Sequence, residues 1–119
     1  MKIHTDNINR LAVVECEGEI VGKGAATILR EAVVSREDSP IIVLDMTEVN
    51  AVEGAGLVML LFLRQWAIAK NIRFKLFNPS RPTLRRLQRA GLLSKFEVTT
   101  LQEVIALATV YESVLAMAS

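Results

Sequence analysis

Few residues of this chain could carry covalent chemistry. The sequence holds one histidine, His4, and one cysteine, Cys16. A Ser-His-Asp or Cys-His arrangement would therefore depend on a single base near the N-terminus, and no HExxH, CxxC or nucleophile-elbow spacing is present. Cys16 has no second cysteine to pair with, so we interpret it as a small buried hydrophobic residue. We expect no hydrolase chemistry and no enzyme activity.

Three carboxylates, Asp45, Glu48 and Glu53, follow a predicted strand. Such a group could hold a metal ion or serve as an acid–base pair. Acids are also common as caps where a strand of a small α/β domain ends, and we favour that structural reading. The sequence therefore predicts neither a metal site nor a cofactor.

Two further patterns could suggest phosphate binding. Gly18, Gly22 and Gly24 superficially resemble a phosphate loop, but no Gly-Lys-Ser/Thr and no GxGxxG follows a strand, so the signal is weak. Residues 81–89 hold four arginines without nearby aromatic residues, which is typical of the solvated face of an amphipathic helix. The net charge of +1 gives no general reason to expect nucleic acid binding.

The charges are nevertheless unevenly distributed along the chain. Residues 15–53 hold nine acids against three basic residues, whereas residues 54–96 hold nine basic residues and no acid. We therefore expect the folded domain to be dipolar.

The length of 119 residues fits one domain, which we place at residues 1–119. No apolar run reaches the roughly 18 residues that span a bilayer, and the N-terminus lacks a basic-then-apolar signal pattern. We expect a soluble, cytoplasmic protein without direct membrane insertion.

Hydrophobic periodicity and turn residues predict strands that alternate with helices. The expected strands are residues 2–5, 10–20, 41–44, 72–77 and a short edge strand at 96–99. The expected helices begin after Gly24, at Gly54, after Ser80 and after Thr100, and the second of them ends at Lys70. This order predicts an α/β fold in which a mixed sheet of four to five strands is flanked by four helices.

The stretch from Asp45 to Leu63 is the strongest functional candidate. The buried strand before Asp45 is expected to end there, and Gly54 and Gly56 then mark a tight turn ahead of a helix. Residues 54–63 carry no charge and are apolar around the whole helix. One sheet cannot cover all of these side chains, so we expect a protein-binding surface here.

Several segments resemble, in order and spacing, the STAS domain of bacterial anti-sigma factor antagonists, and the resemblance covers nearly the whole chain. They are Gly18-Glu19-Ile20, residues 42–45, Val49, Gly56-Leu57, Leu84, Gly91-Leu92 and Phe96. The resemblance implies a small sheet with helices mainly on one side and a regulatory role in transcription and signalling without catalysis. It also implies binding of an anti-sigma factor that is a serine kinase, with release of the sigma factor. The implied partner-binding residues are Glu53, Gly54, Ala55, Gly56, Val58, Met59 and Phe62.

The chain departs from the family pattern at the regulatory loop. The family commonly has Asp-Ser-Ser-Gly, whose first serine accepts phosphate, where this chain has residues 53–56, Glu-Gly-Ala-Gly. The resemblance thus places the family phosphoacceptor at Gly54, which has no hydroxyl, and Thr47 is the nearest upstream substitute. Val21 replaces an aspartate that usually lies near the kinase nucleotide site. Regulation by phosphorylation is therefore not expected at Gly54.

An alternative reading is a STAS subunit of a membrane transporter, docked on its ATPase, or of a multi-protein signalling assembly. In that case the basic helix at residues 81–89 would lie near lipid or nucleotide. The sequence leaves open which partner is bound and whether the chain forms a homodimer.

Overall fold

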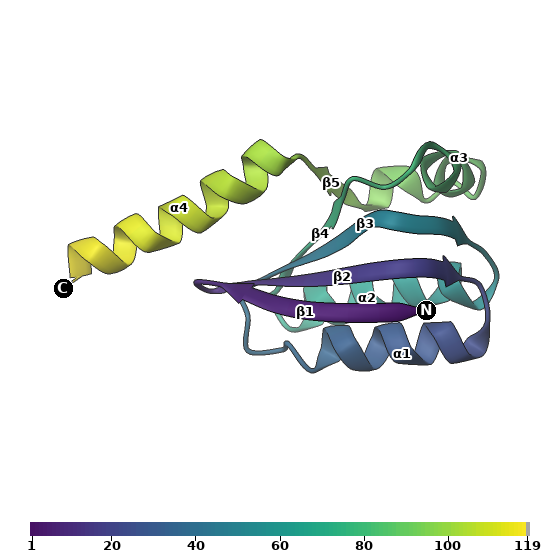
Figure 1. The fold of residues 1–119 in the computed structure, drawn as a ribbon, viewed down its shortest axis with the longest axis horizontal. Coiled ribbons are helices and arrows are strands. Elements are labelled where there is room, and N and C mark those ends of the chain that lie inside the picture. Colours follow the sequence, from purple (N-terminus) through teal and green to yellow (C-terminus); the bar gives the residue numbers. More distant parts are fainter. Residues whose placement is uncertain (119) are drawn as a thin grey trace.

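The computed structural model describes the backbone of residues 1–118 and their side chains apart from 110–116 and 118. Its elements are β1 (Lys2–Ile8), β2 (Leu11–Ile20), α1 (Lys23–Val34), β3 (Ile41–Val52), α2 (Ala55–Ala69), β4 (Arg73–Phe77), α3 (Arg81–Arg89), the short 3-10 helix η1 (Leu93–Lys95), β5 (Glu97–Thr99) and α4 (Leu101–Ala118). Within the described residues this is a five-stranded mixed sheet with four α-helices, which confirms the predicted α/β fold (Figure 1).

The strands lie in the sheet in sequence order, from β1 to β5. β1 pairs antiparallel with β2, and the remaining neighbours are parallel. The opening hairpin is longer than the sequence predicted, because β1 continues to Ile8 and the turn begins at Asn9. Asn9 adopts a φ of 58°, a left-handed conformation that asparagine tolerates better than most residues.

β3 differs most from the prediction. It was expected to end at Asp45, but it continues to Val52 and pairs with β2 along that length. The pairing is irregular at two places, between Asp45 and Glu48 and between Val49 and Ala51, where β3 holds one more residue than β2. Each bulge breaks the in–out alternation that identifies a strand, so the second half of β3 has the sequence pattern of a loop.

One face of the sheet carries the main core. α1 and α2 lie side by side across this face (Figure 1), and α3 adds Leu87 from the side of β3. Fully buried residues of β2 and β3 such as Val14 and Leu44 belong to the same hydrophobic cluster as Leu29 of α1. Gly91 is exposed, because α3 ends at Arg89 and Gly91 follows with a φ of 72°.

The opposite face is apolar only near the β1–β2 turn. There Leu11, Ile41 and Val43 are buried, and Val104 and Leu107 from the first turns of α4 pack against them. Beyond these turns α4 runs past the edge of the sheet and projects away from the domain (Figure 1).

Lys75 lies on this second face, where its side chain is only 8% exposed and forms an ion pair with Glu97 of the neighbouring strand. The hydrogen bond from Lys75 holds the pKa of the Glu97 carboxyl below its usual value of 4.5. Because the folded-state pKa is lowered, the pair stabilises the fold fully above pH 4.5 and less as the pH falls through the folded-state pKa.

We therefore expect Glu97→Gln to lower the free energy of unfolding at neutral pH by about 1–3 kcal/mol, since it leaves the Lys75 ammonium without its partner. Denaturant titrations between pH 7 and pH 3 should show this deficit shrinking below pH 4.5. Glu31→Gln, an exposed change on α1, is the control and should show no such pH dependence. A deficit that stays constant down to pH 3 would contradict the role of this ion pair.

Candidate partner-binding site

The candidate site lies where β2 and β3 end and α2 begins. The backbone N–H of Glu53 donates to the carbonyl of Ile20 at 3.2 Å, which joins the two strand ends. Gly54 then adopts φ 51° and ψ −119°, a conformation open almost only to glycine, and turns the chain into α2. The N–H of Gly56 returns to the Glu53 carbonyl at 2.9 Å. The loop is therefore held by backbone hydrogen bonds as well as by its glycine.

Gly56 is buried in the first turn of α2, close to β2. A Cβ atom at this position would lie 1.9 Å from the carbonyl oxygen of Ile20, far inside van der Waals contact. Gly56 was among the predicted partner-binding residues, but the structure gives it a packing role. It allows α2 to start directly against the end of β2, which positions the exposed residues that follow.

Glu53 is held from the other side by α3. The Arg86 Nε donates to the Glu53 Oε1 at 2.6 Å, and the two side chains are 28% and 47% exposed. The solvated face predicted for the arginines of α3 therefore includes the exposed Arg85 and Arg89 but not Arg86. One signal for this pair was present in the sequence, because acids dominate residues 15–53 and basic residues dominate residues 54–96.

The exposed part of the site is apolar. Val58 is 66% exposed and Phe62, one turn further along α2, is 46% exposed. Met59 and Ala55 are half-buried beside them. Val21, which precedes α1, is 38% exposed, and its carbonyl oxygen lies 3.6 Å from where a Cβ on residue 54 would be. The sequence identified the α2 residues but not Val21, whose exposure depends on how the two loops meet.

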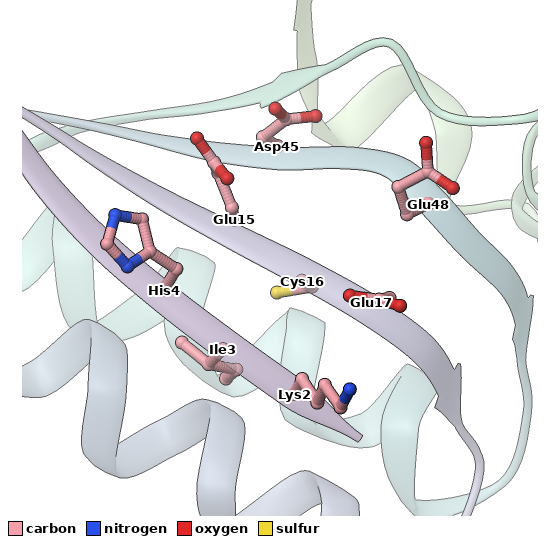
Figure 2. A pocket seen from close by; sticks show the side chains of 8 residues that line it. All are labelled: Lys2, Ile3, His4, Glu15, Cys16, Glu17, Asp45 and Glu48. Atoms are coloured by element: carbon pink, nitrogen blue, oxygen red, sulfur yellow. The ribbon is translucent and has the colours of Figure 1, made fainter.

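The three acids that follow the predicted strand do not come together. Asp45 and Glu48 line a hollow on the second face of the sheet, and their pairing partners on β2 are Glu15 and Glu17 (Figure 2). Glu53 lies eight residues beyond Asp45 and five beyond Glu48, which correspond to roughly 25 Å and roughly 16 Å at the rise of a strand. Among the described residues no group of histidines, cysteines and acids could hold a metal ion.

Figure 2 also shows that His4 and Lys2 of β1 lie beside these acids, in register with Glu15 and Glu17. The hollow is therefore bordered by both signs of charge, as is usual for the solvated face of a sheet. The residues that line it do not include those of the loop at 53–56.

Cys16 points into the core and is 3% exposed. Its burial, and secondly the negative charge of Asp45, raise the pKa of the thiol to about 12. The thiol stays protonated at neutral pH and is a poor nucleophile. The interpretation of Cys16 as a buried hydrophobic residue is confirmed.

Thr47 lies within β3 and not at its end. Its hydroxyl donates to the Asp45 Oδ1 at 2.6 Å and accepts a hydrogen bond from the Asn78 Nδ2 at 3.2 Å. Gly54 lies seven residues further along the chain, about 20 Å away at the rise of a strand. The expectation that Thr47 is close to the regulatory loop was therefore wrong, for the same reason that the end of β3 was misplaced.

These features define a small α/β domain whose loop and apolar helix form one exposed corner. The family model of the STAS domain matches residues 2–113, and the chain belongs to this family.

Solved structures share the fold at low sequence identity. The anti-sigma factor antagonist SpoIIAA in its unphosphorylated form has a TM-score of 0.72 and 19% identity, over 87% of this chain and 93% of that chain. An anti-sigma factor antagonist from Mycobacterium paratuberculosis has a TM-score of 0.73 and 21% identity, over 91% and 93%. A sulfate transporter family protein from Wolinella succinogenes has a TM-score of 0.73 and 16% identity, over 87% and 88%. These likenesses show the fold.

No curated protein sequence matches the chain. Among the described helices, none has both the length and the hydropathy that crossing a membrane requires.

Proposed function

We propose that the chain is a non-catalytic regulatory module that binds an anti-sigma factor of the serine kinase type. The contact surface comprises the loop at residues 53–55 and the exposed side chains of the first two turns of α2, as far as Phe62. One observation carries the proposal: Val58 and Phe62 expose apolar side chains on successive turns at the start of α2. Isolated exposed apolar residues are common, but a pair beside a rigid loop is typical of an interface core.

The neighbouring elements support this assignment. Gly56 and the Glu53–Arg86 ion pair hold the loop and the helix start in one conformation, so a partner would meet a surface that needs little ordering. SpoIIAA, which has the same fold, is an anti-sigma factor antagonist with an unphosphorylated and a phosphorylated form. That similarity supports an anti-sigma factor as the class of partner, and the phosphorylated form of SpoIIAA supports a partner that is also a kinase.

A second candidate is a STAS subunit that docks on a transporter ATPase. The similarity to the sulfate transporter family protein favours it. In both candidate functions the chain binds another protein through an apolar surface and catalyses no reaction. The two functions differ in which protein is bound.

The test is calorimetric titration of the purified chain with the kinase-type anti-sigma factors of its own genome and, separately, with its transporter ATPases. We expect Val58→Glu and Phe62→Glu each to weaken binding at least about tenfold, because a carboxylate would be buried without a partner at the centre of the interface. Circular dichroism should show that both variants remain folded, since both positions are exposed.

Ile68→Glu is the matched control. Ile68 lies on the same helix, is 57% exposed and is away from the loop, so this change should leave the affinity within about twofold. If Val58→Glu and Phe62→Glu stay folded and bind as well as the unchanged protein, the partner surface lies elsewhere. Binding to an ATPase and to no anti-sigma factor would select the second candidate.

A further inference from the structure

We propose that the exposed arginines of α3 form a second contact for the protein that binds the α2 site, and that this partner presents an acidic surface to them. The arginines are Arg81, Arg85 and Arg89, which we call the arginine stripe. The inference rests on the proposed function, because it adds charge recognition to the apolar contact at Val58 and Phe62 and names the chemistry of the partner surface.

The arginine stripe runs along one side of α3. Its members are four residues apart, which places them on one side of a helix at a rise of about 6 Å per step. All three side chains are exposed. Among the side chains that the structure describes, none forms an ion pair with the stripe. Three guanidinium groups therefore meet solvent in a row, and each carries a planar set of donors that fits a carboxylate.

The composition of α3 differs from that of an ordinary solvated helix, which mixes both signs of charge. α3 has four arginines and no acid, and residues 54–96 contain no acid at all. Like charges four residues apart on a helix repel each other, and a cation in the first turn, such as Arg81, is disfavoured by the helix dipole. The stripe therefore destabilises the helix that carries it. A bound acidic surface would remove both penalties.

The stripe lies next to the proposed apolar contact. Arg86 of α3 donates to the Glu53 carboxylate at 2.6 Å. Glu53 precedes Gly54, whose carbonyl accepts the backbone N–H of Val58 at 3.2 Å. A partner packed on Val58 thus meets α3 only a few residues away. Because Arg86 pairs with Glu53, this acid does not oppose an acidic partner.

Four acids of the chain lie on another side of the domain. Glu15, Glu17, Asp45 and Glu48 border the hollow on the second face of the sheet (Figure 2), whereas α3 adds Leu87 to the core on the opposite face. An acidic partner is repelled by the second face and attracted by α3, so the charge distribution orients the partner toward the α2 corner. Charges arranged in this way mainly raise the rate of association.

An acidic protein fits the stripe better than a bilayer or a nucleic acid does. A helix that binds at a membrane surface buries an apolar face, but the two leucines of α3, Leu84 and Leu87, are half-buried and buried. Single-stranded nucleic acid is bound by aromatic residues that stack on the bases, and α3 contains none. The isoelectric point of about 7.9 is also below that expected for a nucleic-acid-binding domain.

The first test is stopped-flow association of the chain with the anti-sigma factor or ATPase that calorimetry identifies. The stripe variant combines Arg81→Gln, Arg85→Gln and Arg89→Gln. We expect it to lower the association rate constant about tenfold at about 50 mM salt and less than about twofold at about 500 mM, where charges are screened. The dissociation rate constant should change less than about threefold. Circular dichroism should show a folded protein, because all three positions are exposed.

The control variant combines Arg10→Gln, Lys70→Gln and Arg73→Gln. It removes the same amount of positive charge at exposed positions, at or next to the end of the sheet where the parallel strands begin. The loop at residues 53–56 follows the opposite end of β3. This variant should associate within about twofold of the unchanged rate. An unchanged rate for the stripe variant at low salt, or equal effects of the two variants, would overturn the proposal.

Val58→Glu separates this inference from the proposed function. If both hold, Val58→Glu chiefly speeds dissociation at every salt concentration, whereas the stripe variant slows association at low salt. If the apolar contact alone is wrong, Val58→Glu changes neither rate and the stripe variant still slows association. If the stripe alone is wrong, Val58→Glu still speeds dissociation and the stripe variant associates like the unchanged chain.

Three polyanions test the class of ligand without an identified partner. They are poly-L-glutamate, vesicles of phosphatidylcholine with phosphatidylserine, and single-stranded RNA. We expect poly-L-glutamate to bind the unchanged chain at about 50 mM salt and the stripe variant at least about threefold more weakly, since carboxylates match the guanidinium groups. Binding of vesicles or RNA that depends on the stripe, with no such binding of poly-L-glutamate, would overturn the proposal.

Discussion

Gly56→Ala will destabilise the domain severely, by about 3 kcal/mol or more, or prevent folding. The added Cβ would lie 1.9 Å from the carbonyl oxygen and 2.8 Å from the carbonyl carbon of Ile20, both backbone atoms. A side chain could rotate away, but here α2 or the end of β2 must move, which disrupts the packing of Leu57 and Leu60 in the core. Urea unfolding followed by circular dichroism measures the loss.

Gly24→Ala is the matched control for this prediction. Gly24 lies in the first turn of α1, and a Cβ at this position would meet no atom within 4 Å. Alanine should stabilise the protein by about 0.4–1 kcal/mol, because it restricts the unfolded chain and favours the helix. If both glycines tolerate alanine equally, α2 does not begin as close to β2 as described, and the rigid corner assumed for partner binding is lost.

The two glycines of the loop show what sequence reasoning could and could not reach. Their spacing predicted a tight turn before a helix, and the structure contains that turn. Their separate roles depend on distances to another strand: Gly54 is required for its backbone conformation, and Gly56 for its contact with Ile20. No pattern within residues 53–57 contains that information, because Ile20 is more than thirty residues away.

The same limit explains the errors in β3. The alternation of apolar and polar residues identified β2 and β4, because it is nearly regular in these strands. The two bulges of β3 shift its register against β2, and only the pairing of the two strands reveals them. Placing the end of the strand too early brought Asp45 and Thr47 close to the loop in the prediction. The structure moves both onto the second face of the sheet and leaves Glu53 paired with Arg86.

The unmodified protein will not accept phosphate on the loop at residues 53–56. Incubation with the partner kinase and ATP, followed by mass spectrometry, should find none there, because neither Gly54 nor Ala55 has a hydroxyl. Thr47 is unlabelled as well in this prediction, since its hydroxyl is hydrogen-bonded to Asp45 and lies about 20 Å along the strand from the loop. Stoichiometric phosphate at Thr47 or within the loop would refute this prediction.

Restoring a hydroxyl distinguishes the two loop positions. Gly54→Ser places a side chain on a residue whose backbone φ is 51°, a conformation that is strained for residues other than glycine. We expect it to lower the free energy of unfolding by about 1–3 kcal/mol. Ala55 is the first residue of α2, so Ala55→Ser should cost under about 0.5 kcal/mol. If the kinase still recognises the loop, Ala55→Ser becomes the better acceptor. Its phosphate would place about −1.5 to −2 charges beside Val58 and repel a partner packed there. Labelling of Gly54→Ser at full stability would show instead that the loop relaxes into another conformation when a side chain is present.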